Sequence, residues 1–166
     1  GGRIQLLAST QNPYQIRDGL AKLFGEPPAS IRVVARDVGG SFGMKAGLSR
    51  EEALVYWTAR KLGRPVRWMS DRSEAFLSDD QARDVQFEAE LGLDKAGHFV
   101  ALKVKYDVNI GAYLSNRSMG PITNIGGVAG VYRTPLIAAE VYGVLTNTLP
   151  TSPYRGAGRP DATYVI

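Results

Sequence analysis

The sequence predicts an α+β fold in which helices pack against a mostly antiparallel sheet. Three observations indicate this: two capped helical stretches, one pair of long alternating segments joined by a tight turn, and further short β-branched segments. The chain has 166 residues, of which 44% are hydrophobic and 22% are charged. Because this length and composition suffice for one core, we predict a single domain over residues 1–166.

The first predicted helix covers the stretch NPYQIRDGLAKLF. Asn12 is a favourable N-cap, and Pro13 suits the first helical position, where its missing N–H costs nothing. Gly25 ends the helix, because glycine readily adopts the left-handed conformation of a C-terminal cap. The helix carries one apolar stripe, formed by Ile16, Leu20, Leu23 and Phe24.

The second predicted helix follows the stretch SREEALVYWTARKLG. Ser49 and Glu52 have the spacing of a capping box, and Gly63 marks the end of the helix. One of its faces carries Leu54, Trp57 and Leu62. A third, shorter helix is predicted within residues 70–78.

Strands are predicted at residues 31–35 and 136–146, and residues 82–113 read as a long hairpin with its turn at 94–97. Apolar residues alternate with polar ones along both arms, which indicates a sheet with one solvent-exposed face. Residues 115–135 are rich in Gly, Asn, Ser and Pro and show no periodicity, so we interpret them as a long irregular loop.

Charge and cysteine content exclude several classes of function. The net charge is +4, but basic residues are scattered among acidic ones, so nucleic-acid binding is not expected. The chain has no cysteine, which excludes disulfides, Cys-ligated iron–sulfur clusters and Cys zinc sites within it. No apolar run reaches the length of a membrane span, and the opening residues lack a signal-peptide pattern, so we expect a cytoplasmic protein.

Both ends of the sequence suggest a larger parent protein. The opening Gly-Gly resembles a cloning remnant, and the last residues read as the first turns of a helix. We therefore expect this chain to be a fragment of a larger subunit.

The sequence offers few ordinary catalytic groups. His98 is the only histidine, and it falls in the predicted hairpin turn, where an exposed role is expected. No protein-ligated metal site is predicted. A group of acidic residues fits helix starts and solvated loops better than acid–base chemistry: Asp71, Glu74, Asp79, Asp80 and Asp84.

Two glycine-rich loops remain, DVGGSFGMKAG at residues 37–47 and YRGAGRP at 154–160. Glycine permits positive φ and lets a ligand approach the main chain, where successive N–H groups form an anion-binding nest. Neither loop has the spacing of a Walker P-loop or of the dinucleotide fingerprint. A tight turn would also explain either loop alone.

These loops and their surroundings resemble a known family. STQNPYQIRDGLAKLFGEPPASIRVVARDVGGSFGMK, EEALVYWTARKLGRPVRWMSDRSEAFLSDDQARD and YRGAGRPDA occur here in the order and at the separations typical of it. The family is the molybdopterin-binding large subunit of xanthine dehydrogenase, aldehyde oxidase and carbon monoxide dehydrogenase. The likeness covers nearly the whole chain, which corresponds to the first of two molybdopterin-binding domains.

The resemblance implies roles for particular residues. Gln11 corresponds to a catalytic-site glutamine whose carboxamide hydrogen-bonds an oxygen ligand of molybdenum. The first loop corresponds to the family's GGGFG motif, whose amides face the metal ligands and the pterin. Together with the second turn, the implied cofactor-binding residues are Gln11, Gly40, Ser41, Phe42, Gly43, Arg155, Gly156, Ala157 and Gly158.

Departures from the family pattern narrow the expected substrate. Ala46 stands where purine-oxidising members carry Glu, and Ala157 stands where they carry an aromatic. Gly156 stands where copper-dependent carbon monoxide enzymes carry Cys. The second loop is most similar to the AYRGAGR-type loop of the carbon monoxide dehydrogenase-like group. Ser41 replaces a glycine of the first motif.

The resemblance implies a molybdenum hydroxylase that oxidises an aldehyde or N-heterocycle with water-derived oxygen. Its cofactors would be molybdopterin, as the cytosine dinucleotide, with molybdenum here, and FAD and [2Fe-2S] on partner subunits or domains. Its partners would be the second molybdopterin-binding domain and the iron–sulfur and FAD subunits. The family's base, a glutamate, lies beyond Ile166, so the isolated chain should be inactive. The alternative is a non-catalytic phosphate- or nucleotide-binding module that uses the two loops.

Overall fold

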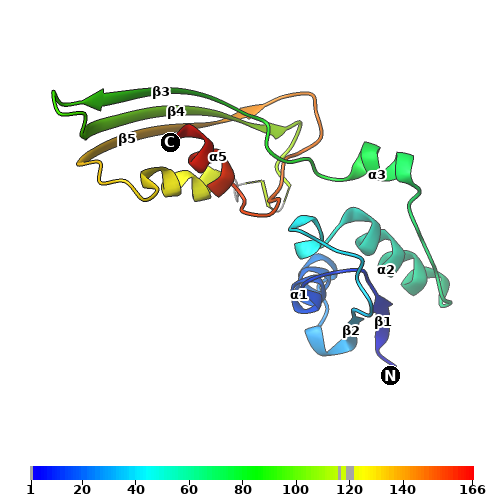
Figure 1. Cartoon of the computed structure of the whole chain (residues 1–166). Coiled ribbons are helices and arrows are strands. Elements are labelled where there is room, and N and C mark those ends of the chain that lie inside the picture. The colour runs from blue at the N-terminus through cyan, green and yellow to red at the C-terminus, as the bar shows by residue number, and fades with distance from the viewer. Residues whose placement is uncertain (1, 116, 119–121) are drawn as a thin grey trace. The chain divides into compact units, whose positions relative to one another are not determined.

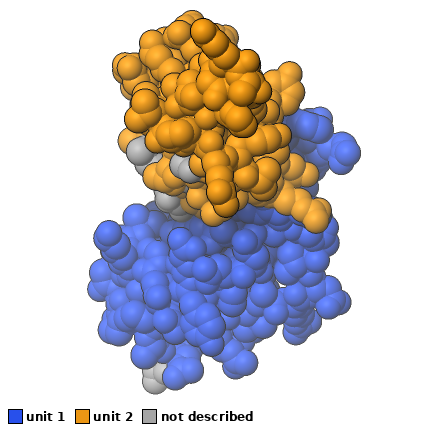
Figure 2. All heavy atoms as spheres, turned by 60° about the vertical axis from the view of Figure 1, so that its left-hand side comes forward, with its two compact units in different colours: residues 1–78 blue, residues 79–166 orange. Residues whose placement is uncertain are grey.

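A computed structural model describes residues 2–115, 117–118 and 122–166 of the chain. The chain divides into two compact units, unit 1 at Gly1–Ser78 and unit 2 at Asp79–Ile166 (Figures 1 and 2). Each unit combines helices with a small sheet, so the α+β class is confirmed. The prediction of one domain over the whole chain stays a prediction.

Unit 1 is built around two short parallel strands joined through a helix (Figure 1). Its elements in order are β1 (Ile4–Leu7), α1 (Pro13–Phe24), η1 (Pro28–Ser30), β2 (Ile31–Val34), η2 (Met44–Ala46), α2 (Arg50–Leu62) and α3 (Arg72–Ser78). β1 pairs with β2 in register from Ile4 opposite Ile31 to Leu7 opposite Val34. The sequence analysis did not predict β1, because this strand is short and, unlike the equally short β2, has only one β-branched residue.

The helix caps form as predicted. The Asn12 side chain accepts a hydrogen bond from the Gln15 N–H at 3.2 Å, and Gly25 ends α1 in the left-handed conformation with a φ of 66°. Both hydrogen bonds of the Ser49–Glu52 capping box are present at the start of α2. These interactions satisfy the N–H groups that a helix terminus otherwise leaves without partners.

The core of unit 1 comprises Leu6, Ile16, Leu20, Ala21, Ile31 and Tyr56. α1 buries the predicted stripe in part, because Leu23 remains 59% exposed. On α2 the face that carries Leu54, Trp57 and Leu62 is exposed, and Tyr56 is buried in its place. The Tyr56 ring contacts the Phe24 ring, with a centroid distance of 5.3 Å.

A buried polar contact accompanies Tyr56. Its hydroxyl donates to Glu26 Oε2 at 2.6 Å, and Arg60 forms an ion pair with the other oxygen of the same carboxylate. Burial, followed by the hydrogen bond to Glu26, raises the pKa of Tyr56 to about 12. The tyrosine therefore stays neutral in the folded chain well above its ordinary pKa of 10.0.

Unit 2 is a three-stranded sheet in the order β3–β4–β5. Its elements are β3 (Val85–Leu93), β4 (Phe99–Gly111), η3 (Asn124–Ala129), β5 (Leu136–Leu145) and α5 (Arg159–Val165). β3 and β4 form the predicted hairpin. β5, however, runs parallel to β4.

The predicted mostly antiparallel sheet is therefore corrected to one parallel pair of strands and one mixed sheet. Among the strands of the described residues, β1–β2 and β4–β5 are parallel pairs and only β3–β4 is antiparallel. The physical reason is the length of the connections: α1 and the segment before β5 are long enough to return the chain to the starting end of the sheet. Strand direction leaves no mark in an alternating pattern.

One face of the sheet in unit 2 is apolar and the other is charged, as the alternation predicted. Figure 1 shows α5 and η3 on one side of this sheet. There the buried residues of β4 pack against Val128 and Ala162. On the opposite face, Lys103 pairs with Glu90 at 3.3 Å. The β4 residues in the core are Leu102, Val104, Tyr106 and Val108.

The segment predicted as an irregular loop contains η3, and its residues 116 and 119–121 lie outside the described residues. Within the described part, none of the helices combines the length and apolar character that crossing a bilayer requires.

Replacing Tyr56 by Phe should lower the free energy of unfolding by about 2 kcal/mol at neutral pH, because Glu26 loses a buried hydrogen bond. Wild-type stability should fall as the pH rises from 10.0 to about 12, since the unfolded chain loses the Tyr56 proton first. That fall should shrink in the variant. Urea denaturation at about pH 8 and about pH 11.5 measures both effects.

The matched control is Tyr14→Phe, because Tyr14 is 69% exposed. If both variants lost the same stability and showed the same alkaline fall, the assigned role of Tyr56 would be wrong.

Candidate functional site

The first glycine-rich loop follows β2 and has an unusual backbone. Three of its residues have positive φ: Gly40 at 107°, Phe42 at 53° and Gly43 at 115°. The Phe42 ring folds back onto Gly40, where an added Cβ would lie 2.8 Å from the ring atom Cε2. Gly40 is therefore required both for its backbone angle and for the space that the ring occupies.

Parallel pairing brings Gln11 to this loop. The carboxyl ends of parallel strands lie at the same edge of a sheet, so the segments after β1 and β2 are neighbours. The Ala8 N–H continues the pairing by donating to the Val34 carbonyl at 3.1 Å. Beyond it, Gln11 Oε1 accepts from the Gly43 N–H at 3.2 Å and from the Ser41 hydroxyl.

Lys45 joins the two segments through its main chain and its side chain. The Lys45 carbonyl accepts from the Gln11 N–H at 3.1 Å and from Thr10 Oγ1 at 2.9 Å. The Lys45 ammonium donates to Ser9 Oγ at 2.9 Å. Thr10 is only 2% exposed. These contacts hold the Gln11 backbone in one position relative to the loop.

The second glycine-rich loop, in unit 2, also has three residues with positive φ, and here they are consecutive. They are Gly156 at 99°, Ala157 at 47° and Gly158 at 95°. A Cβ at Gly156 would lie 2.7 Å from two ring carbons of Pro160. The turn therefore excludes any side chain at this position unless Pro160 moves.

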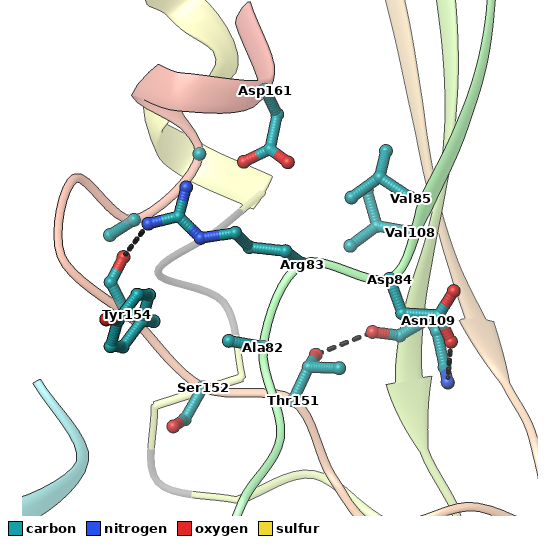
Figure 3. A pocket seen from close by; sticks show the side chains of 12 residues that line it. Ala82, Arg83, Asp84, Val85, Val108, Asn109, Thr151, Ser152, Tyr154 and Asp161 are labelled. Carbon is teal, nitrogen blue, oxygen red and sulfur yellow. Dashed lines mark hydrogen bonds between the residues drawn. The ribbon is translucent and has the colours of Figure 1, made fainter.

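Arg83 holds this second turn from the start of the hairpin. Its guanidinium donates to the Arg155 carbonyl at 2.6 Å and to the Tyr154 carbonyl at 3.3 Å. It also lies over the Tyr154 ring, 4.9 Å from the centroid. Figure 3 shows the Arg83 side chain extending toward Tyr154. Arg83 itself has a φ of 61°, an uncommon value for arginine.

A buried asparagine supports the segment that leads into the turn. Asn109 Nδ2 donates to Asp84 Oδ2 at 2.7 Å, and Thr151 Oγ1 donates to the Asn109 carbonyl at 2.5 Å. Main-chain bonds join Gln81 to both Pro150 and Ser152. Asp84, Asn109 and Thr151 line one hollow together with Ala157 and Gly158 (Figure 3).

The donors of the two loops fit an anionic ligand that approaches the main chain. Within residues 2–115, 117–118 and 122–166, no protein acceptor is assigned to the amides of Gly40, Ser41, Gly156 and Gly158. Successive amides in left-handed turns form anion-binding nests. The Gly43 amide differs, because it donates to Gln11. Taken by itself, the donor set of each loop suits the oxygen atoms of an anion.

Other titratable groups are placed elsewhere. His98 lies exposed in the hairpin turn and contacts Asp94, with 3.0 Å between Nδ1 and Oδ2. Hydrogen bonds from the His98 backbone and side chain lower the pKa of Asp94. In the described part of the chain, no three His, Cys, Asp or Glu residues group in a way that could hold a metal ion.

The structure brings the predicted residues together within each unit. Gln11 lies with Gly40, Ser41, Phe42 and Gly43 in unit 1. Arg155 and residues 156–158 form one turn in unit 2. The prediction that the two loops share one ligand stays a prediction.

Two residues in this arrangement were missed by the sequence reasoning. Arg83 contacts a carbonyl 72 positions later, and Lys45 contacts a hydroxyl 36 positions earlier. Contacts at such separations have no local pattern. The one available signal concerned Lys45, which is a basic residue within the first glycine-rich loop.

Each unit carries a loop of left-handed backbone, and the loop of unit 1 is hydrogen-bonded to a carboxamide. Donor sets of this kind are typical of domains that bind anionic organic ligands. The chain belongs to the molybdopterin cofactor-binding domain family, whose model matches residues 1–166. The resemblance described from the sequence motifs is thereby confirmed.

Relatives of known function are several times longer. The chain is 36% identical over 158 residues to 6-hydroxypseudooxynicotine dehydrogenase complex subunit gamma of Paenarthrobacter nicotinovorans. The aligned residues make up 93% of this chain and 20% of the relative. Quinoline 2-oxidoreductase from Pseudomonas putida 86 superimposes with a TM-score of 0.88 at 38% identity, over 94% of this chain and 20% of that one. CO dehydrogenase from Oligotropha carboxidovorans superimposes with a TM-score of 0.91 at 30% identity, over 99% of this chain and 21% of that one. The chain spans about a fifth of each.

Replacing Arg83 by Met should loosen the turn at residues 154–158, because two carbonyls lose a charged donor while the side-chain volume is largely kept. Amide hydrogen exchange at Ala157 and Arg159 should accelerate about tenfold, whereas exchange in β3 and β4 should not change. Mass spectrometry of exchanged peptides measures both regions.

The control is Arg32→Met, since Arg32 is an exposed residue of β2 in unit 1. Equal exchange at Ala157 in the Arg83 variant and in the wild type would contradict the role assigned to Arg83.

Proposed function

We propose that the protein carrying this chain is a molybdenum hydroxylase and that residues 1–166 form one domain of its large subunit. The observation that supports this most directly is the Gln11 carboxamide, held against a loop of left-handed backbone at the carboxyl ends of two parallel strands. Family membership supports the same reading. Because the relatives are about five times as long, the isolated chain should not turn over substrate.

The residues present fit a molybdenum cofactor. We propose that the first loop, with Gln11, Gly40, Ser41, Phe42 and Gly43, and the second turn, with Arg155, Gly156, Ala157 and Gly158, both contact it. The amides of Gly40, Ser41, Gly156 and Gly158 would bind its oxygen and phosphate atoms, and Gln11 Nε2 would donate to an oxygen at the metal. When bound, the cofactor supplies the two-electron oxidation of an electron-poor carbon with oxygen from water. Phe42, which is 54% exposed, would exclude water beside it.

The substrate class is an aldehyde or an N-heterocycle. Ala46 and Ala157 offer no carboxylate and no aromatic clamp for a purine. The Pro160 ring leaves no room for a cysteine at Gly156, and the chain has none, so a cysteine-bound copper is not part of this proposal. Two of the relatives are named after quinoline, which is an N-heterocycle, and after 6-hydroxypseudooxynicotine. Of the two substrate classes, these names favour the N-heterocycle.

Further cofactors and partners belong to the same proposal. The molybdopterin would carry a cytosine dinucleotide tail. FAD and [2Fe-2S] clusters on partner subunits or domains would accept the electrons, and a second molybdopterin-binding domain of the same subunit would complete the site. This chain has no cysteine for such clusters.

Metal and pterin analysis of the full-length complex tests this function. About one molybdenum per large subunit is expected, with cytidine monophosphate released on acid hydrolysis, followed by turnover of aldehydes or N-heterocycles in a substrate screen. A complex that retains a nucleotide or phosphate without molybdenum or pterin would instead support the non-catalytic binding module.

Replacing Gln11 by Ala in the full-length protein should lower kcat about 10- to 100-fold while the fold and the molybdenum content are kept, because one donor to the reacting centre is lost. Steady-state kinetics and metal analysis measure this. The control is Gln5→Ala on the exposed side of β1. If the Gln11 variant turned over substrate as fast as the wild type, the assignment of Gln11 to the site would be wrong.

Replacing Gly43 by Val should reduce molybdenum incorporation, because a β-branched residue is strained at a φ of 115° and would displace the loop. The molybdenum content per folded subunit is the measurement. Gly97→Val is the matched control, since Gly97 also has positive φ, at 86°, but lies in the hairpin turn. If both variants incorporated equal molybdenum, the first loop would not be a cofactor contact.

A further inference from the structure

The Gln11 carboxamide can present either an oxygen or an N–H₂ group to a ligand, and its neighbours decide which. The Gly43 main-chain N–H can only donate a hydrogen bond, so the atom of Gln11 that faces it at 3.2 Å must be the oxygen. This contact alone sets the orientation of the amide. One hydrogen bond to an exposed side chain, however, restrains it only weakly.

Ser41 supplies a second donor to the same oxygen. The Lys45 N–H donates to Ser41 Oγ at 3.1 Å, which occupies a lone pair of the hydroxyl. The hydroxyl hydrogen is then directed to Gln11 Oε1, with which Ser41 Oγ is in contact. The chain Lys45 N–H, Ser41 O–H and Gln11 oxygen thus runs in one direction, and each bond polarises the next.

With both lone pairs of its oxygen occupied, Gln11 has its Nε2 hydrogens left to donate. Within the residues that the structure describes, no protein acceptor is assigned to Nε2. We propose that Ser41 is a positioning residue that holds Gln11 with its N–H₂ group toward the ligand, so that the ligand atom at this point is an oxygen acceptor.

The proposal deepens the proposed function, on which it rests for the nature of the ligand. A glycine at position 41, as in the related motif, provides no hydroxyl. Gln11 would then be held by the Gly43 amide alone. Ser41 therefore gives this chain an additional restraint on the group that meets the ligand, independent of the backbone angles of the loop.

The test is Ser41→Ala in the 166-residue chain, observed by nuclear magnetic resonance with ¹⁵N labelling. The Gln11 side-chain amide signals should move toward those of an exposed glutamine such as Gln5. Exchange of the Lys45 amide should accelerate about fivefold, because its acceptor is removed. Ser41→Thr keeps the hydroxyl and should retain both wild-type properties.

Ser9→Ala is the matched control, since Ser9 contributes a hydroxyl to the Lys45 ammonium but does not contact Gln11. It should leave the Gln11 signals unchanged. The proposal would be overturned if the Ser41→Ala variant kept the Gln11 side-chain signals and the Lys45 amide exchange rate of the wild type. Ser41→Thr behaving like Ser41→Ala would also overturn it, because the hydroxyl would then not be the cause.

The full-length protein provides a second readout. Ser41→Ala should lower kcat about tenfold, leave KM close to wild type and leave the molybdenum content unchanged, because the donor is misoriented while binding persists. An unchanged kcat would overturn the positioning role. Absence of molybdenum from the wild-type protein would overturn the proposed function instead, while the resonance experiment still decides whether Ser41 orients Gln11.

Discussion

The hydrogen bond from the Gly43 amide to Gln11 Oε1 is the contact on which the candidate site of unit 1 depends. It joins the segment after β1 to the loop after β2. It can form because the two strands are parallel, so that both segments leave the same edge of the pair. An antiparallel pairing would send them to opposite edges. A pair of strands only four residues long thus decides which side chains meet.

Left-handed backbone is the second constraint, and both units use it. Glycine adopts these angles without steric cost, whereas Phe42 and Ala157 adopt them at an energetic cost that the surrounding contacts must offset. In the first loop, the Phe42 ring packs onto Gly40. In the second loop, the Arg83 guanidinium donates to the carbonyls of residues 154 and 155, and the Pro160 ring lies against Gly156. Phe42 and Ala157, the non-glycine residues with positive φ in these loops, therefore mark positions where the chain holds its main-chain amides in a fixed direction.

Polar contacts, more than apolar burial, hold these loops. The core of each unit consists of aliphatic and tyrosine side chains on the strands and helices, and the loops lie outside it. Thr10 and Asn109 are buried exceptions. The Thr10 hydroxyl donates to the Lys45 carbonyl of the first loop, and the Asn109 carbonyl accepts from the Thr151 hydroxyl, in the segment that leads to the second loop. A loop held by hydrogen bonds keeps its direction while leaving its outer surface available for a ligand.

The sequence by itself determined the features whose chemistry is local. The Asn12 and Ser49 caps act over three residues, and the hairpin turn at 94–97 closes within four. Gly40, Gly43, Gly156 and Gly158 have positive φ within the loops where the sequence predicted it. The family motifs added the identity of the candidate residues. Tertiary structure alone decided the parallel direction of β1 and β5, the burial of Tyr56 in place of Trp57, and the contacts of Gln11 with Ser41 and of Arg83 with Arg155. The last two join residues 30 and 72 positions apart. The reason is physical: caps and turns bond to near neighbours in the chain, whereas strand direction, helix orientation and long-range hydrogen bonds depend on where the folded backbone places its partners.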